Sequence, residues 1–348
     1  MSSISTKSRL GTFLVRATRH IADTVYPEKA ADRSDWILSR RPERNAVDPR
    51  RPYAFLMENE RAEPGELVPT ATVFLTNREC PWRCLMCDLW KNTVSNPVPM
   101  GAIPEQIDFA LKELTRQAAE SGHAAPEQIK LYNSGSFFDP KAIPEADYPV
   151  IARRVREFKR VIVECHPALI GERVLRFRDM VEGRLEVAMG LETVHPEVLE
   201  KLNKRVTVEQ FASAAAFLLQ HEIAMRAFVL VKPPFMDEST ALEWARRSIV
   251  FAFDCGATAV VLIPVRSGNG ALDALQRMGE FEPPKLRTLE EAVWYGLGLQ
   301  RGRVFADLWD LQLFSSCPKC FPQRLARLQI FNETQTMSLC PPCEVCGE

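Results

Sequence analysis

Short apolar runs alternate with longer segments of helical period along the middle of the chain. The runs are unbroken and rich in Val, Ile and Leu, which is typical of parallel strands that are covered on both faces. They are residues 70–76, 129–133, 160–164, 185–190, 226–231 and 258–264. The longer segments carry an apolar stripe, with helix start and stop signals at their ends. The clearest of them are residues 104–122, 207–222 and 237–256.

Strand-then-helix units in series predict an α/β protein with a parallel sheet and right-handed crossovers. The six units seen here are fewer than the eight of a closed barrel. We therefore expect a partial, TIM-like (β/α)6 barrel, with a doubly wound sheet as the alternative. In both folds, the loops after the carboxyl ends of the strands build the functional site. We expect an N-terminal extension at 1–66, the barrel at 67–270 and a small cysteine-rich C-terminal region at 271–348.

Composition and charge narrow the class of protein. The chain has 348 residues, of which 46% are hydrophobic and 26% charged, as is typical of a folded, soluble enzyme. A net charge of −1 excludes a generally basic surface, so any nucleic-acid contact needs a local patch. The best patch is 40–51, with five arginines against two acids, and a solvated surface strap is the alternative. No run of 18 apolar residues is present, so we expect no membrane span.

The ten cysteines indicate metal binding rather than disulfides. Eight of them fall in two tight clusters, at 80–87 and 317–346, with spacings that are typical of metal sites in a reducing compartment. We therefore expect a cytoplasmic protein. The first 20 residues carry four basic and no acidic side chains, which is typical of a transit peptide and also of an amphipathic surface helix.

Cys80, Cys84 and Cys87 form a Cys-x3-Cys-x2-Cys loop that begins four residues after the first predicted strand. An iron–sulfur cubane has four irons, which are normally held by cysteine thiolates. Three cysteines therefore leave one iron open to an exogenous ligand. A zinc-binding loop is the alternative, but the position after an apolar strand in a β/α series disfavours it.

This loop, in this position, resembles that of the radical S-adenosylmethionine superfamily, although Met86 stands where many members carry an aromatic residue. The resemblance implies a [4Fe–4S] cluster on the three cysteines, with S-adenosylmethionine bound to the open iron. It also implies reductive cleavage to a 5′-deoxyadenosyl radical, and hence a reductant such as flavodoxin or ferredoxin. Such chemistry belongs to the cofactor, so we predict no catalytic side chain beyond the cluster.

Two further stretches extend the resemblance. Residues 131–140, LYNSGSFFDP, occupy the place of the superfamily's glycine-rich turn, which implies that Ser134, Gly135 and Ser136 bind S-adenosylmethionine. Glycine there lets the backbone approach a ligand closely, and an ordinary turn is the alternative. Residues 185–211 resemble the fourth-strand region of the tRNA-modifying branch, which contains the elongator catalytic subunit and the methylthiotransferases.

Four polar residues follow the predicted strands on the side of the cysteine loop. Glu164 and Glu192 end the third and fourth strands, where a carboxylate accepts ribose hydroxyls or holds a substrate cation. The alternative for each is a paired surface acid. Lys232 follows the fifth strand, where related sequences often have Gly-Leu-Pro-Gly, and we place it with both glutamates in the cofactor site. His166 is a further candidate, although a lone histidine is more often structural.

The second cysteine cluster predicts a separate metal site. Cys317-x2-Cys320 and Cys340-x2-Cys343 are separated by 19 residues, a spacing typical of four-thiolate zinc. Cys346 makes the fourth ligand ambiguous, because it forms a further Cys-x2-Cys pair with Cys343. A second iron–sulfur cluster on the last three cysteines and a redox role are the alternatives. We expect the residues between the two pairs to make a small hairpin.

The arginine-bearing N-terminal extension, the SGSFFD and GLET stretches and the cysteine-rich C-terminus together resemble the radical S-adenosylmethionine subunits of archaeosine synthase and their uncharacterised relatives. That resemblance implies a tRNA substrate, in which the C–N bond of a lysine–deazaguanine adduct is cleaved. It also implies a partner enzyme that first attaches the lysine. Two other classes remain open: a radical enzyme acting on a small molecule or peptide, and a non-catalytic zinc-binding interaction protein.

Overall fold

The described residues cover most of the chain. The structure, a computed structural model, describes residues 25–62, 65–122, 124–338 and 343–347. The basic segment at 1–20, with its two interpretations, therefore lies outside the described residues. Among the described helices, none combines the length and the apolar character that crossing a bilayer requires.

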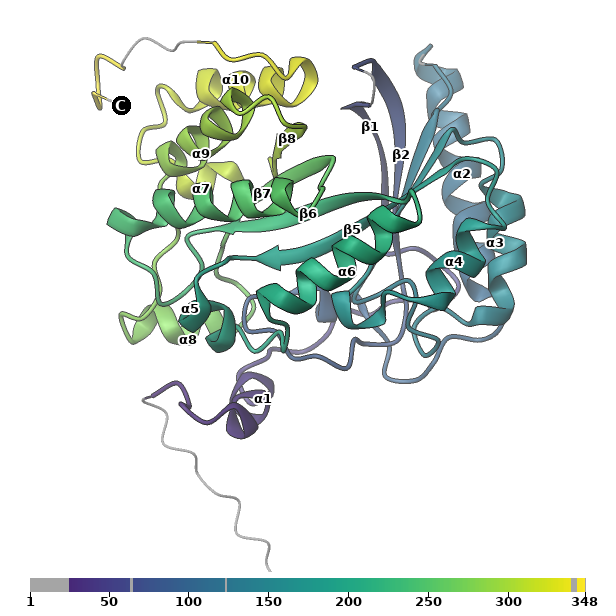
Figure 1. The fold of residues 1–348 in the computed structure, drawn as a ribbon, viewed down its shortest axis with the longest axis horizontal. Coiled ribbons are helices and arrows are strands. Elements are labelled where there is room, and N and C mark those ends of the chain that lie inside the picture. Colours follow the sequence, from purple (N-terminus) through teal and green to yellow (C-terminus); the bar gives the residue numbers. More distant parts are fainter. Residues whose placement is uncertain (1–24, 63–64, 123, 339–342, 348) are drawn as a thin grey trace, which may run out of the picture.

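Within the described residues, one curled sheet of eight strands forms the centre of the fold (Figure 1). In the order of the sheet, the strands are β1 (Ala54–Arg61), β2 (Leu67–Leu75), β3 (Gln128–Asn133), β4 (Arg160–Glu164), β5 (Arg184–Glu192), β6 (Ala224–Val231), β7 (Ala259–Pro264) and β8 (Arg303–Ala306). From β2 to β8 each strand runs parallel to its neighbour, whereas β1 pairs antiparallel with β2.

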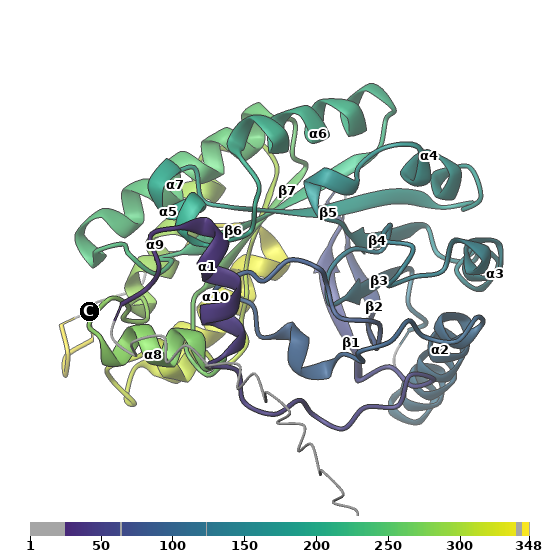
Figure 2. The same cartoon turned by 90° about the horizontal axis from the view of Figure 1, so that it is seen from below.

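Most of the helices lie on the outer, convex side of this sheet (Figure 2). The helices are α1 (Ala30–Leu38), α2 (Ala102–Ser121), α3 (Tyr148–Arg154), α4 (Glu172–Arg178), α5 (Pro196–Lys201), α6 (Val208–Gln220), α7 (Glu238–Asp254), α8 (Ala271–Arg277), α9 (Leu286–Gly298) and α10 (Phe321–Thr334). Short 3-10 helices are η1 (Leu89–Asn92), η2 (Glu145–Asp147), η3 (Pro167–Leu169) and η4 (Leu311–Phe314).

The fold class predicted from the sequence is confirmed. The six predicted strands are β2 to β7, and the three predicted helices are α2, α6 and α7. The strands follow one another in chain order around a curled sheet, which is the expected partial α/β barrel and not the doubly wound alternative. The three-part division of the chain at residues 66 and 270 stays a prediction.

The sequence pattern does not reveal the two outermost strands, β1 and β8. β1 lies within the predicted N-terminal extension, and acidic residues interrupt its apolar pattern. Two of these acids, Glu58 and Glu60, pair with Lys130 of β3 at 2.9 and 2.5 Å. These ion pairs explain why acidic residues occur in a strand whose sequence shows no regular alternation of apolar and polar residues. β8 has only four residues, which is too short for a periodic signal.

The small hairpin predicted between the C-terminal cysteine pairs is wrong, because these residues form the helix α10. Leu325, Leu328 and Phe331 recur at helical spacing, and this apolar stripe packs against the main core. α10 contacts both β8 and β1, so it lies between the two outermost strands of the sheet.

Two amide side chains at the end of α10 bind the free edge of β8. Asn332 Oδ1 accepts from Ala306 N at 2.8 Å, and its Nδ2 donates to Ala306 O at 2.9 Å. Gln335 makes the same pair of bonds with Val304, at 2.7 and 3.0 Å. These bonds replace the ladder that a neighbouring strand would supply.

Charged side chains from five strands meet inside the barrel, near the amino ends of the parallel strands. Arg226 is central: its Nε lies 2.7 Å from Glu186 Oε1, and its Nη2 lies 2.6 Å from Glu60 Oε1. Lys130 pairs with Glu60, and Arg303 pairs with Glu186. All five side chains are buried. Burial alone would raise the pKa of Glu186, but Arg226 and two further arginines outweigh it and lower that pKa to about 2.

Acid should weaken this charge cluster. Glu186 has a pKa of about 2 in the folded protein, against roughly 4.3 for a glutamate in an unfolded chain. Because the folded pKa is the lower one, the stabilisation is present above the unfolded pKa and is lost as the pH falls toward the folded value. Urea unfolding at a series of pH values should show this loss, and Glu186→Gln should show a shallower one. Equal slopes for both proteins would contradict it.

Candidate active site

The cysteine loop follows β2, at the carboxyl ends of the parallel strands. Cys80, Cys84 and Cys87 are each half-buried in it. Burial is the main reason that the pKa of each of these thiols is raised, to about 12. Without a metal the three side chains are therefore neutral thiols, and a bound metal has to displace their protons.

Hydrogen bonds from two other loops hold the cysteine loop in place. Leu85 N donates to Leu202 O at 2.9 Å, and Asn203 Nδ2 donates to Arg83 O at 2.7 Å. From the loop after β7, Asn269 Nδ2 donates to Leu85 O at 2.8 Å. None of these three bonds uses a thiol, so the course of the loop does not depend on the cysteine side chains.

The helix α1, which lies below the barrel in Figure 1, covers the same loop. Leu85 is fully buried in an apolar cluster that includes Trp36 of α1 and Leu202. Tyr26, just before α1, donates its hydroxyl to Lys201 O at 2.6 Å. The predicted N-terminal extension therefore takes part in shaping the site.

The arginine-rich segment between α1 and β1 is engaged within the chain. Glu79, which precedes the first cysteine, pairs with Arg41 at 2.6 Å and also with Arg44. Arg50 pairs with Glu105 at 2.5 Å. The remaining two guanidinium groups lie over aromatic rings. These partners favour the surface-strap interpretation of the segment over a phosphate-binding patch.

The predicted glycine-rich turn packs directly against the first cysteine. Gly135 has a φ of 135°, and a Cβ there would lie 3.0 Å from Cys80 Cβ and 3.3 Å from its Sγ. The hydroxyls beside it bind the chain itself: Ser134 Oγ donates to Leu89 O at 2.8 Å, and Ser136 Oγ accepts from His166 N at 2.7 Å. The turn is therefore built so that bare backbone approaches the cysteine loop.

Asn133 ends β3 beside this turn, and the sequence pattern predicts no role for it. Its side chain is 1% exposed, yet neither Oδ1 nor Nδ2 has a hydrogen-bond partner. A buried amide without partners is costly and rare, so it fits a polar ligand that binds at this end of the barrel. The only feature of the sequence that could have pointed to Asn133 is its position as a polar residue at the end of the apolar run IKLYN.

Glu164 ends β4 and reaches the same place, where its carboxylate accepts a hydrogen bond from Asn133 N. Burial raises its pKa to about 8, against smaller opposing effects of that hydrogen bond and of Lys204. With this pKa the carboxyl group is mostly protonated at neutral pH. A bound cation would favour its ionised form.

Glu192 and Lys204 form a buried ion pair beside the cysteines. Glu192 has a φ of 66°, and the register between β5 and β6 shifts between Gly190 and Glu192. The backbone at Glu192 therefore departs from the regular strand conformation. Gly190 makes room for the pair, because a Cβ there would lie 2.0 Å from Lys204 Nζ. Lys204 also lies close enough to Cys80 and Cys84 for its charge to favour their thiolates. Lys204 belongs to the 185–211 stretch that resembles the tRNA-modifying branch, but the sequence predicts no site role for it.

His166 has a structural position. Its ring stacks on Trp82 of the cysteine loop, with centroids 3.8 Å apart. Its Nδ1 accepts from Ala168 N at 3.2 Å, so Nε2 carries the proton and donates to Lys204 O at 3.1 Å. Burial, followed by the charge of Lys204, lowers the His166 pKa to about 4, so the ring is neutral. The ring therefore supports the cysteine loop.

Lys232 follows β6 with a φ of 50°. Its Nζ lies 3.1 Å from Glu238 Oε2, at the start of α7, and 3.4 Å from Pro283 O. These contacts give the buried lysine partners of its own, so its role as a cofactor ligand stays a prediction.

Gly135→Ala should impair the cysteine loop. The added Cβ collides with Cys80, and the positive φ is strained for any L-residue. Iron retained after anaerobic reconstitution should fall by at least about 10-fold, as it does when groups that orient metal ligands are disturbed. Gly279→Ala is the matched control, because it has a φ of 76° and open space around the new Cβ. Equal iron loss in both variants would mean that backbone strain alone is responsible.

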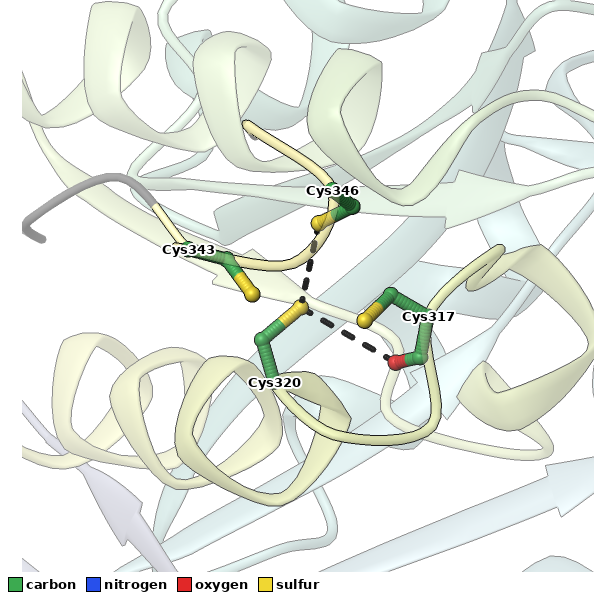
Figure 3. Close-up of side chains that lie close together, drawn as sticks. All are labelled: Cys317, Cys320, Cys343 and Cys346. Atoms are coloured by element: carbon green, nitrogen blue, oxygen red, sulfur yellow. Dashed lines mark hydrogen bonds between the residues drawn. The ribbon is translucent and has the colours of Figure 1, made fainter.

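The second cysteine cluster is also assembled in the structure. Among the described residues, Cys317, Cys320, Cys343 and Cys346 bring their sulfur atoms within 4.8 Å of one another (Figure 3). Cys340, the fifth predicted ligand, lies outside the described residues.

Comparison with curated proteins finds distant relatives, while no known family profile matches the chain. An uncharacterised protein of Methanocaldococcus jannaschii is 22% identical over 326 residues, covering 86% of this chain and 87% of the relative. Archaeosine synthase subunit beta of Methanosarcina acetivorans is 26% identical over 239 residues, covering 65% of this chain and 66% of the relative. The same subunit of Thermococcus kodakarensis is 26% identical over 231 residues, covering 64% and 69%.

Solved structures are more remote. The Elp3 protein of Methanocaldococcus infernus has a TM-score of 0.47 at 15% identity, covering 58% of this chain and 52% of that chain. Coproporphyrinogen III oxidase of Escherichia coli, a radical S-adenosylmethionine enzyme, has a TM-score of 0.45 at 14% identity, covering 68% and 53%. The sheet order, and not these scores, establishes the fold. The resemblance predicted from the sequence is confirmed by the curated relatives, and the chain is a distant relative of archaeosine synthase subunit beta.

Proposed function

We propose that the chain is a radical S-adenosylmethionine enzyme. Cys80, Cys84 and Cys87 would hold a [4Fe–4S] cluster, and S-adenosylmethionine would complete its coordination. The cluster and S-adenosylmethionine, when bound, supply a 5′-deoxyadenosyl radical that takes a hydrogen atom from the substrate. The observation that carries the proposal is the unpartnered Asn133 amide, which is buried beside a firmly held cysteine loop.

The residues of the chain would bind and orient S-adenosylmethionine. Asn133 offers both a donor and an acceptor, and the bare backbone at Gly135 lies against the first cysteine. Glu164 would ionise next to the amino group or accept a ribose hydroxyl. Ser134 and Ser136 would contribute through their backbone, because their hydroxyls are bound within the chain.

Two charged residues would act on the surroundings of the cofactor. Glu192 is already paired with Lys204, and this bond would hold the lysine ammonium group in place beside the thiolates. Lys232 stays a proposed contact to S-adenosylmethionine or substrate. It would have to exchange its present partner Glu238 for the ligand.

We propose a tRNA base as the substrate class, and specifically the lysine–deazaguanine adduct whose C–N bond would be cleaved. The names of the curated relatives and the match of residues 185–211 to tRNA-modifying enzymes support this. The reaction would need a partner enzyme that attaches the lysine and a reductant such as flavodoxin or ferredoxin. The two thiol clusters suit the reducing conditions of the cytoplasm.

A small molecule or peptide is the second candidate substrate class. One observation favours it: the arginines of the predicted phosphate patch already interact with partners within the chain, and the net charge is −1. A tRNA enzyme ordinarily presents a basic surface to its substrate. An enzyme of this second class would cleave S-adenosylmethionine without any response to tRNA.

An anaerobic assay separates these classes. The protein is reconstituted with iron and sulfide, reduced, and given S-adenosylmethionine with tRNA that carries the lysine adduct, with unmodified tRNA, or with no tRNA. We expect 5′-deoxyadenosine in all three and a marked increase only with the adduct. A response to neither tRNA would support the small-molecule class. Absence of cleavage, with zinc as the only metal, would support a non-catalytic interaction protein.

A further inference from the structure

Four thiols surround a single point at the C-terminal end of the described chain. The Sγ atoms of Cys320 and Cys346 lie 3.7 Å apart, and all four sulfurs lie within 4.8 Å of one another. Ligands at about 2.3 Å from one tetrahedral zinc lie about 3.8 Å from each other. We propose that Cys317, Cys320, Cys343 and Cys346 bind one structural Zn²⁺, a site that is independent of the function proposed above.

The two halves of the site repeat the same local geometry. Each comes from a Cys-x2-Cys turn, one before α10 and one in the C-terminal tail (Figure 3). Backbone N–H groups two and three residues further on point at the first sulfur of each turn, in Cys317 and in Cys343 alike. Val345 N, for example, lies 3.4 Å from Cys343 Sγ. Such N–H groups stabilise a thiolate, so both turns are prepared to act as metal ligands.

The spacing disfavours the other uses of these thiols. In an iron–sulfur cluster the four thiolates are divided among two or four irons, so they cannot all lie as close together as four ligands of one ion. A disulfide needs sulfurs at about 2.05 Å, which is far shorter than the separation of Cys320 and Cys346. Cys317 and Cys320 are also 3% and 6% exposed, which suits a closed structural site better than a redox exchange.

All four positions of the ion would be filled by protein, so no open position for catalysis remains. The ion would instead fasten the tail at 343–347 to the start of α10. Arg324 of α10 in turn makes a buried ion pair with Glu290 of α9 at 2.7 Å. Figure 1 shows α10 and the tail on the opposite side of the molecule from α1, which covers the cysteine loop. The proposed zinc is therefore a separate centre.

Metal analysis of the full-length protein tests the site. The protein is purified anaerobically without reconstitution, and zinc and iron are counted for wild type, Cys343→Ser, Cys346→Ser and Cys340→Ser. We expect about one zinc per chain in wild type. Both tail variants should lose it, and neither removes a residue from the buried core. Cys340→Ser is the matched control, because the four proposed ligands already complete the coordination without it.

A second readout follows the consequence for the fold. Amide hydrogen exchange across α10 should be faster in Cys343→Ser than in Cys340→Ser, while exchange at the strands β2 to β7 stays the same. Zinc kept by both tail variants, zinc lost from Cys340→Ser, or iron with sulfide in place of zinc would each overturn the proposal. Substituted Co²⁺ should give the absorption of a tetrahedral thiolate site, and an octahedral spectrum would equally overturn it.

Discussion

Replacing Cys84 with alanine should abolish iron binding at the loop after β2, and S-adenosylmethionine cleavage with it. Loss of outer partners of metal ligands costs about 10- to 100-fold in affinity or activity, so loss of a ligand itself should cost more than about 100-fold. The fold should persist, because backbone contacts from Leu202, Asn203 and Asn269 hold the loop without any thiol. Iron per chain and 5′-deoxyadenosine formation are the measurements.

Cys255→Ala is the matched control for this experiment. Cys255 is half-buried at the end of α7, and a helix position there does not depend on the thiol. The control should keep its iron and its cleavage rate, and the thermal midpoints of both variants should stay near that of wild type. Unchanged iron in Cys84→Ala would show that the trio does not hold the cluster. A large fall in its thermal midpoint would show that the loop is needed for the fold.

Arg226→Met should give the largest loss of stability. The arginine links Glu60 and Glu186 inside the barrel, and its removal leaves two buried carboxylates without their central partner. Breaking a buried ion pair in this way costs about 3–5 kcal/mol. Methionine keeps most of the length of the side chain. The decrease in the free energy of unfolding should therefore come mainly from the lost charge and less from the lost volume. Urea unfolding at neutral pH measures it.

Arg247→Ala provides the comparison. Arg247 pairs with Glu243 on the exposed side of α7 at 2.7 Å, and both side chains are more than half exposed. Exposed pairs contribute about 0–1 kcal/mol, so this variant should unfold close to wild type. Similar losses for the two arginine variants would mean that the buried cluster contributes no more than a surface pair.

The sequence predicts those parts of the molecule that rest on local pattern. Buried parallel strands are continuous apolar runs, so β2 to β7 are found with nearly correct bounds. The cysteine trio is found because its spacing and its place after a strand are both local. The hairpin prediction fails at α10 because it rests on the cysteine spacing, whereas Leu325, Leu328 and Phe331 recur at helical spacing.

The remaining features depend on contacts between distant segments. β1 carries acids because Lys130 and Arg226 meet them across the barrel, which no window of sequence shows. Asn133 becomes notable only once its amide is seen to be buried without a partner. Lys204 stands next to Cys84 because the loops after β2 and β5 meet, 120 residues apart at the Asn203–Arg83 bond.

The position of α10 has a consequence for how the protein behaves in solution. An open barrel has two free strand edges, and a free edge is a template on which another chain can add a strand and start aggregation. Asn332 and Gln335 occupy the hydrogen-bonding groups of β8, and the helix itself lies against β1. A chain cut before Phe321 would lose this cover and expose both edges at once. The helix that follows the first C-terminal cysteine pair would therefore keep both edges of the sheet from pairing with other copies of the chain.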